Sequence, residues 1–127
     1  PWPLNPEGEL MLGLKIEDRE CVANAEYICK VPGLSYAEWG PGDMGMSYGF
    51  ADAHDPPSPQ VMEDARNTIK GACDDNGIHF LCSWKDPSKT TAENVQFLMD
   101  WGVRIISGGG EDHAKIGREI SGREMPV

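Results

Sequence analysis

The apolar residues of the chain gather in four short runs, and segments of helical periodicity separate them. A run of about four to eight apolar residues is typical of a buried strand, whereas apolar residues three or four positions apart are typical of a helix packed on one face. The four runs cover residues 10–16, 34–39, 78–84 and 103–107. Each run predicts a β-strand.

A helix is predicted after each of these strands. Ser58 stands before a proline at the first helical position, and Thr90 forms a capping box with Glu93, two patterns typical of helix N-termini. Gly77 and Gly102 stand where the periodic spacing stops, as is common at helix C-termini. The predicted helices cover residues 22–29, 59–75, 91–101 and, with weaker periodicity, 111–120.

Glycine and proline interrupt this pattern in two places. Gly40-Pro41-Gly42 predicts a turn after the second strand, because its glycines are free to adopt positive φ. Residues 44–57 hold glycines and prolines without sustained periodicity, so we expect a long loop there, and long loops are often functional. His54 in this loop is more typical of a solvated histidine than of a ligand.

The alternation of strands and helices predicts an α/β fold with a parallel sheet and right-handed crossovers. Two architectures fit the 127 residues of the chain. One is a complete doubly wound domain of the flavodoxin type, and the other is half of a (β/α)₈ barrel, which needs about 250 residues when whole. The chain begins without Met in a proline-restrained segment, which we interpret as a connecting loop of something longer. Both architectures place chemistry at the C-terminal ends of the strands.

Composition narrows the classes of partner. Eleven Lys and Arg residues against 21 Asp and Glu residues give a net charge of −10, so the surface repels phosphate backbones and nucleic acid is a poor partner. The apolar runs are far shorter than the roughly 18–20 residues that cross a bilayer, and the N-terminus is unlike a signal peptide. We therefore expect a soluble, cytoplasmic protein with no membrane partner. The four cysteines lack metal-binding spacing and are expected to be buried free thiols.

Two acidic residues follow neighbouring strands of the predicted sheet. Glu17 ends the first strand, and Asp43 follows the second, 26 positions later. Because parallel neighbours end side by side, the two carboxylates make a hard oxygen site of the kind that Mg²⁺ or Mn²⁺ occupies together with water and substrate. The alternative is that Glu17 is a first-turn helix charge and Asp43 an ordinary turn residue.

The glycine-flanked turn before Asp43 adds a second feature. Successive backbone N–H groups in such a turn bind anionic groups such as a carboxylate or a phosphate. A metal ligand and an anion site in one loop would suit an α-keto acid, whose carboxylate and keto oxygens chelate a metal. A metal that acts as a Lewis acid on the ketone would stabilise an enolate, the central species of aldol chemistry.

The stretch from Asn5 to Gly49 resembles a known family. It holds, in order, Leu-Lys-Ile-Glu, Val-Pro-Gly and Gly-Pro-Gly-Asp-Met-Gly-Met-Ser-Tyr-Gly. These segments and their spacing are similar to those of the HpcH/HpaI aldolase and citrate lyase family, whose members are (β/α)₈ barrels. The resemblance implies that residues 1–127 form a single partial barrel domain, similar to the last four βα units of a TIM barrel.

The resemblance also implies roles for particular residues. Glu17 and Asp43 would bind the metal, and the backbone amides of Gly42 and Asp43 would bind the substrate carboxylate. Trp84, at the end of the third strand, is a candidate for the substrate pocket. Lys15 stands where these aldolases often have Gln, and an inward Lys15 would compete with the metal for Glu17. The family's catalytic Arg and His–Asp pair belong to the first half of the barrel, so we expect the general base and the cationic residue outside this sequence.

These observations favour a carbon–carbon lyase. We expect a class II aldolase that depends on a divalent metal, Mg²⁺ or Mn²⁺ with Co²⁺ as a further candidate, and acts on pyruvate or another 2-oxo acid through a metal-bound enolate. The chain alone would be nearly inactive. Its expected partners are the small substrate and either further copies or the missing N-terminal half, because a half barrel leaves two strand edges unpaired. The alternatives are a flavodoxin-like domain that binds Mg²⁺ or a small ligand in a regulatory role, and a non-catalytic remnant that packs against a partner.

Overall fold

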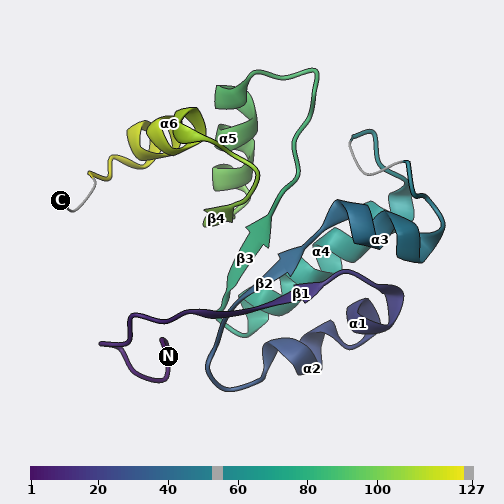
Figure 1. Cartoon of the computed structure of the whole chain (residues 1–127), viewed down its shortest axis with the longest axis horizontal. Helices are drawn as coiled ribbons and strands as arrows, with labels where there is room; N and C mark the ends of the chain where they lie inside the picture. The colour runs from purple at the N-terminus through teal and green to yellow at the C-terminus, as the bar shows by residue number, and fades with distance from the viewer. Residues whose placement is uncertain (53–55, 125–127) are drawn as a thin grey trace.

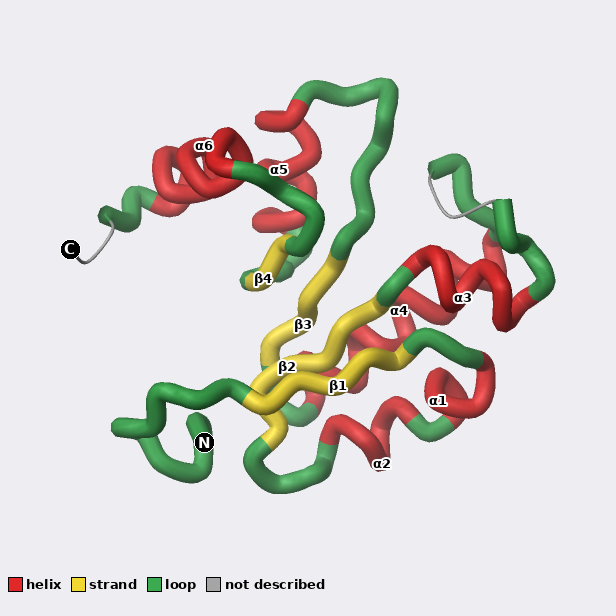
Figure 2. The backbone as a smooth tube through the Cα atoms, viewed as in Figure 1, coloured by secondary structure: helices red, strands yellow, loops and turns green. Residues whose placement is uncertain are grey.

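The computed structural model describes residues 1–52 and 56–124 and has an α/β fold (Figure 1). Four strands form one parallel sheet, and each of them lies within one of the four predicted runs (Figure 2). His54 lies outside the described residues, so its predicted exposure stays a prediction. The strands are β1 Leu12–Ile16, β2 Leu34–Trp39, β3 His79–Cys82 and β4 Ile105–Ile106.

The order of the strands in the sheet distinguishes the two predicted architectures. The strands are hydrogen-bonded in the order β1-β2-β3-β4, which is their order along the chain. A doubly wound sheet reverses its strand order at a switch point, whereas a (β/α)₈ barrel adds each strand beside the last one. The sheet is therefore an open segment of a barrel, with β1 and β4 at its two edges, and the flavodoxin-like alternative is wrong.

The strand β2 covers its whole predicted run, whereas the other three strands are shorter than the apolar runs that predicted them. Leu10 and Met11 lie before β1, and Met11 makes only an isolated bridge with Trp2. At the other edge of the sheet, β4 is two residues long. Its hydrogen-bonded neighbour in the described chain is β3, and only the last two residues of β3 pair with it, Leu81 with Ile105 and Cys82 with Ile106. Edge strands have a partner on one side only, so their ends are the first to lose regular pairing.

All four predicted helices are present, and the first is divided at Asn24 into two short helices. The capping box predicted for Thr90 is confirmed: its Oγ1 accepts from Glu93 N at 3.3 Å, and its backbone N–H donates to Glu93 Oε2 at 2.8 Å. Ser58 is not the N-cap, because the extended Pro59 takes that position, and no side chain of residues 1–52 and 56–124 caps the helix there. The helices are α1 Arg19–Ala23, α2 Ala25–Cys29, α3 Pro41–Tyr48, α4 Gln60–Asp75, α5 Thr91–Asp100 and α6 Glu111–Ser121.

The helix α3 corrects the sequence prediction of a turn followed by a loop. Gly40 has a φ of −104° and acts as the N-cap, so the predicted positive-φ turn is wrong. Pro41 occupies the first helical turn, where its missing N–H costs nothing, and Gly49 ends the helix with a φ of 85°. Residues 44–48 are therefore helical. Glycines inside the segment weakened its apolar pattern, but the proline at the start and the glycine at the end are ordinary helix boundaries.

The core lies between the sheet and α4, which Figure 1 shows behind β1 and β2. Ile16, Trp39 and Cys82 are register partners on β1, β2 and β3, and all three are fully buried on the helix side. Because strand side chains alternate, Lys15 and Glu38 point to the opposite face. The cysteines are free thiols as predicted, and all except the partly exposed Cys21 are buried.

No helix in residues 1–52 and 56–124 has both the length and the apolar character needed to span a bilayer.

Candidate functional site

The two predicted metal ligands lie at the C-terminal ends of β1 and β2. Glu17 directly follows β1, and Asp43 lies in the first turn of α3, which begins just after β2. Both residues border one open cavity of about 480 Å³, together with Gly42. The structure thus brings Glu17, Gly42 and Asp43 together, while their ligand roles stay a prediction. The cavity is lined by Lys15, Glu17, Glu38, Gly40, Gly42, Asp43, Met46, Ala51, Ser83 and Ser107.

Gly40 makes room for the carboxylate of Glu17. A Cβ atom added at Gly40 would overlap Oε1, the carboxylate oxygen of Glu17 that also accepts from Lys15. Gly40 itself has ordinary extended backbone, so its small size is needed for space and not for its φ. The glycine after β2 therefore fixes where the Glu17 side chain can lie.

The N-terminus of α3 supplies the backbone donors that the sequence assigned to a turn. The first N–H groups of a helix have no partner within it. No side chain in the described part of the chain caps α3, and Pro41 has no N–H, so among these residues the amides of Gly42 and Asp43 are the donors of the first turn without a partner. A Cβ at Gly42 would meet nothing within 4 Å, so the space beside these amides is open. The predicted anion-binding amides are present, but a helix terminus carries them.

Lys15 enters the same site from β1. Its Nζ donates to Glu17 Oε1 at 3.0 Å and lies 4.0 Å from Glu38 Oε1. The pKa of Lys15 is raised above its usual value, first by the hydrogen bond to Glu17 and then by the charge of Glu38, with a smaller effect of Asp43. Two carboxylates lie within 4.0 Å of this ammonium group, and Asp43 borders the same cavity, so the site has an excess of negative charge that suits a further cation.

Glu38 and Ser83 border the cavity, although the sequence prediction passed over both. Glu38 is the register partner of Lys15, which places the two side chains on the same face of the sheet. The signal was available, because Glu38 stands two positions before Gly40 just as Lys15 stands two positions before Glu17. Alternation along two neighbouring parallel strands would have paired them.

Trp84 lies beside this cavity and does not border it. Its ring packs on Phe97 at a centroid distance of 4.6 Å, and the guanidinium of Arg66 lies 5.5 Å from its centre. It lines an adjoining cavity of about 250 Å³, and Ser83 and Ser107 border both cavities. The role of Trp84 in substrate binding stays a prediction, with a place next to the carboxylate site.

The donor atoms of the site fit a hard divalent cation. Among residues 1–52 and 56–124, no group of three or more His, Cys, Asp and Glu side chains is close enough together to hold a metal by itself. Mg²⁺ and similar ions are usually bound by one or two carboxylates and keep several waters, so Glu17 and Asp43 fit this pattern. The positive charge of the Lys15 ammonium group is the feature of the site that opposes the binding of a cation.

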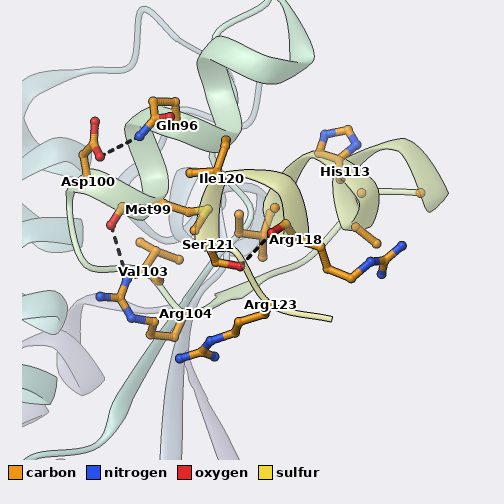
Figure 3. Close-up of a pocket in the computed structure, with 15 residues that line it drawn as sticks. Gln96, Met99, Asp100, Val103, Arg104, His113, Arg118, Ile120, Ser121 and Arg123 are labelled. Carbon is orange, nitrogen blue, oxygen red and sulfur yellow. Dashed lines mark hydrogen bonds between the residues drawn. The ribbon is translucent and has the colours of Figure 1, made fainter. Parts of the chain in front are cut away.

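A larger cavity of about 670 Å³ lies between α5 and α6 (Figure 3). Arg104, Arg118 and Arg123 border it, and Arg104 Nη1 donates to the carbonyl oxygens of Met99 and Val103 at 3.2 and 3.1 Å. None of the predicted site residues borders this cavity. Its positive charge is unsuited to a metal cation, so the candidate site remains at the ends of β1 and β2.

Comparison with protein families gives one match over most of the chain. Residues 6–109 match the family model described as HpcH/HpaI aldolase/citrate lyase. No curated protein matches the chain.

Solved structures share the fold. A HpcH/HpaI aldolase/citrate lyase family protein from Burkholderia cenocepacia superposes with a TM-score of 0.65 at 17% identity, over 90% of this chain and 41% of that chain. Citrate synthase SbnG gives a TM-score of 0.66 at 26% identity, over 88% of this chain and 42% of that chain. Macrophomate synthase gives a TM-score of 0.62 at 23% identity, over 89% of this chain and 36% of that chain. The chain therefore spans less than half the length of each of these proteins.

Proposed function

Because the chain belongs to the HpcH/HpaI aldolase/citrate lyase family, we propose that it carries the metal-binding part of a carbon–carbon lyase that acts on pyruvate or a related 2-oxo acid. The family is one of aldolases and lyases, so enzyme function is the general assignment, and the metal and the substrate are the parts proposed. The observation that supports them is the common cavity of Glu17 and Asp43 at the C-terminal ends of neighbouring parallel strands.

Glu17 and Asp43 are the residues that would hold the metal. Their hard oxygen donors favour Mg²⁺ or Mn²⁺, with Co²⁺ as a further candidate. A metal held by these two carboxylates would supply Lewis-acid chemistry at the keto oxygen of a 2-oxo acid, which carbon–carbon cleavage or formation next to that carbonyl requires.

The amides at the start of α3 would bind and orient the substrate. The N–H groups of Gly42 and Asp43 donate to the carboxylate of the 2-oxo acid, with the positive end of the helix dipole behind them. Ser83 and Ser107 border the cavity just beyond the ends of β3 and β4, and their hydroxyls would donate to a substrate oxygen. Trp84 lines the adjoining cavity, which Ser83 and Ser107 also border, so it would contact the part of a substrate that extends there.

The general base and the cationic residue would come from the part of the barrel that this chain does not span. Proton transfer by a positioned group is typically worth about 10²–10⁴ in rate. We therefore expect the chain alone to have little activity and to gain it when an N-terminal half barrel supplies these residues. A cytoplasmic location also stays a prediction.

Titration with Mn²⁺ followed by pyruvate tests this proposal. We expect Mn²⁺ to bind in calorimetry and pyruvate to bind more tightly once Mn²⁺ is present. Glu17→Gln and Asp43→Asn should each lower the Mn²⁺ affinity at least about tenfold, since even the outer partners of metal ligands are worth about 10–100-fold. Glu111→Gln is the matched control, because Glu111 pairs with a lysine on α6 and does not border the cavity. Equal Mn²⁺ affinities in the wild type and in these three variants would contradict the proposal.

A further inference from the structure

Lys15 places a positive charge inside the candidate metal site. Its Nζ is 3.0 Å from Glu17 Oε1, and Lys15, Glu17 and Glu38 all border the cavity of Asp43. A divalent ion and an ammonium group repel each other strongly when both contact the same carboxylate. A metal can therefore bind Glu17 well only when Lys15 leaves it.

Glu38 is the carboxylate that can receive the displaced ammonium. Lys15 and Glu38 are partners in the register of β1 and β2, and their charged atoms are already 4.0 Å apart. In the described part of the chain, Glu38 accepts no hydrogen bond from another side chain, although its own side chain is only 16% exposed. The Lys15 side chain is 59% exposed, so it has room to rotate from one carboxylate to the other.

We propose that Lys15 is an internal counterion of the site, which holds Glu17 when no metal is bound and moves to Glu38 when a divalent ion binds. This inference rests on the proposed function, because it takes Glu17 as a metal ligand. It gives Lys15 and Glu38 a regulatory role. Lys15 raises the metal concentration at which the site fills. Glu38 lowers this concentration, because it stabilises the Lys15 ammonium group after that group has left Glu17.

Calorimetric titration of the full chain with Mn²⁺ measures the effect of Lys15. We expect Lys15→Gln to raise the Mn²⁺ affinity about tenfold, because it removes a unit charge a few ångströms from a divalent ion, and water screens this partly exposed group. Lys15→Arg keeps the charge and should have an affinity close to that of the wild type. Lys115→Gln is the matched control: Lys115 is 56% exposed, is paired with Glu111, and lies on α6 away from the cavity.

A double-mutant cycle measures the part played by Glu38. Glu38→Gln removes a negative charge, so it weakens Mn²⁺ binding somewhat in any background. With Lys15 present it also removes the second position of the ammonium, so its effect should be at least about threefold larger there than in Lys15→Gln. Such non-additivity is the signature of two residues that act on the metal through each other.

The outcomes separate this inference from the proposed function. If Lys15→Gln and Lys115→Gln bind Mn²⁺ equally and Glu17→Gln still abolishes binding, the counterion role is refuted and the metal site stands. If no protein in the series binds Mn²⁺, both are refuted. If Lys15→Gln binds Mn²⁺ about tenfold more tightly than the wild type and Glu17→Gln binds it more weakly than the wild type, both are supported. Far-UV circular dichroism and a thermal melt of each variant check that it is folded under the conditions of the titration.

Discussion

Gly40→Ala should weaken metal binding strongly while it leaves the fold almost unchanged. The added Cβ would overlap Glu17 Oε1, so the Glu17 side chain has to rotate out of the position in which it borders the cavity. The backbone need not change, because the φ of −104° and ψ of 112° at Gly40 are open to alanine. The substitution therefore changes the position of the Glu17 carboxylate and leaves the backbone as it is.

The expected magnitudes follow from opposing effects at Gly40. Gly→Ala at a compatible position stabilises a protein by about 0.4–1 kcal/mol, because it reduces the freedom of the unfolded chain. Gly40 is also the N-cap of α3, where alanine is a poorer residue by a similar amount. Rotation would also break the exposed Lys15–Glu17 pair, and exposed ion pairs contribute little to stability. The net change in unfolding free energy should stay within about 1 kcal/mol, whereas the Mn²⁺ affinity should fall at least about tenfold.

Urea denaturation and Mn²⁺ calorimetry on the same protein test both magnitudes. Gly42→Ala is the matched control, because its Cβ would meet nothing within 4 Å and Glu17 keeps its place. Gly42→Ala should bind Mn²⁺ as the wild type does but bind pyruvate more weakly, since the methyl group fills space beside the amides at the start of α3. Wild-type Mn²⁺ affinity in Gly40→Ala would refute the argument that Gly40 positions Glu17 for a metal.

Further predictions concern stability and thiol reactivity. Thr90→Ala removes the capping box of α5 and should lower the unfolding free energy by about 0.5–2 kcal/mol in urea denaturation; an unchanged midpoint would contradict this. Hydrogen bonds donated by Thr90 lower the pKa of Glu93, so the stability this carboxylate adds is present above its unfolded pKa and is lost as the pH falls through its folded pKa. The difference between Thr90→Ala and the wild type should therefore shrink below about pH 4 in acid denaturation. Burial raises the pKa of Cys82 to about 11, so at about pH 8 a thiol reagent should label the partly exposed Cys21 first, and rapid labelling of Cys82 in mass spectrometry would contradict its burial.

The fold could be predicted from the sequence because its strongest signals are local. Each strand lies within a short apolar run, and the long helix α4 buries apolar residues at helical spacing, among them Met62, Ile69 and Cys73. The alternation of these elements favours a parallel sheet, but only the observed strand order shows that the sheet continues as a barrel does. Strand order depends on packing between segments far apart in the chain, which periodicity alone does not contain.

The candidate site was predicted in part. Glu17 and Asp43 were found because each follows a strand, and the ends of parallel neighbours meet. The helix that begins at Pro41 was missed because its glycines hide an apolar face that buries only Met44 and Gly45. Glu38 was missed because a charged residue inside an apolar run is usually taken as the solvent side of a strand, and in an open barrel segment that side is the one that faces the site.

The site can be tested most directly with a crystal of the chain soaked in Mn²⁺, by the anomalous scattering of the metal. We expect one strong peak within about 2.0–2.6 Å of carboxylate oxygens of both Glu17 and Asp43, with the Lys15 ammonium turned toward Glu38. A crystal of Glu17→Gln soaked in the same way should lack that peak. A metal bound elsewhere, or a peak that touches only one of the two carboxylates and persists in Glu17→Gln, would contradict a shared metal site at the ends of β1 and β2.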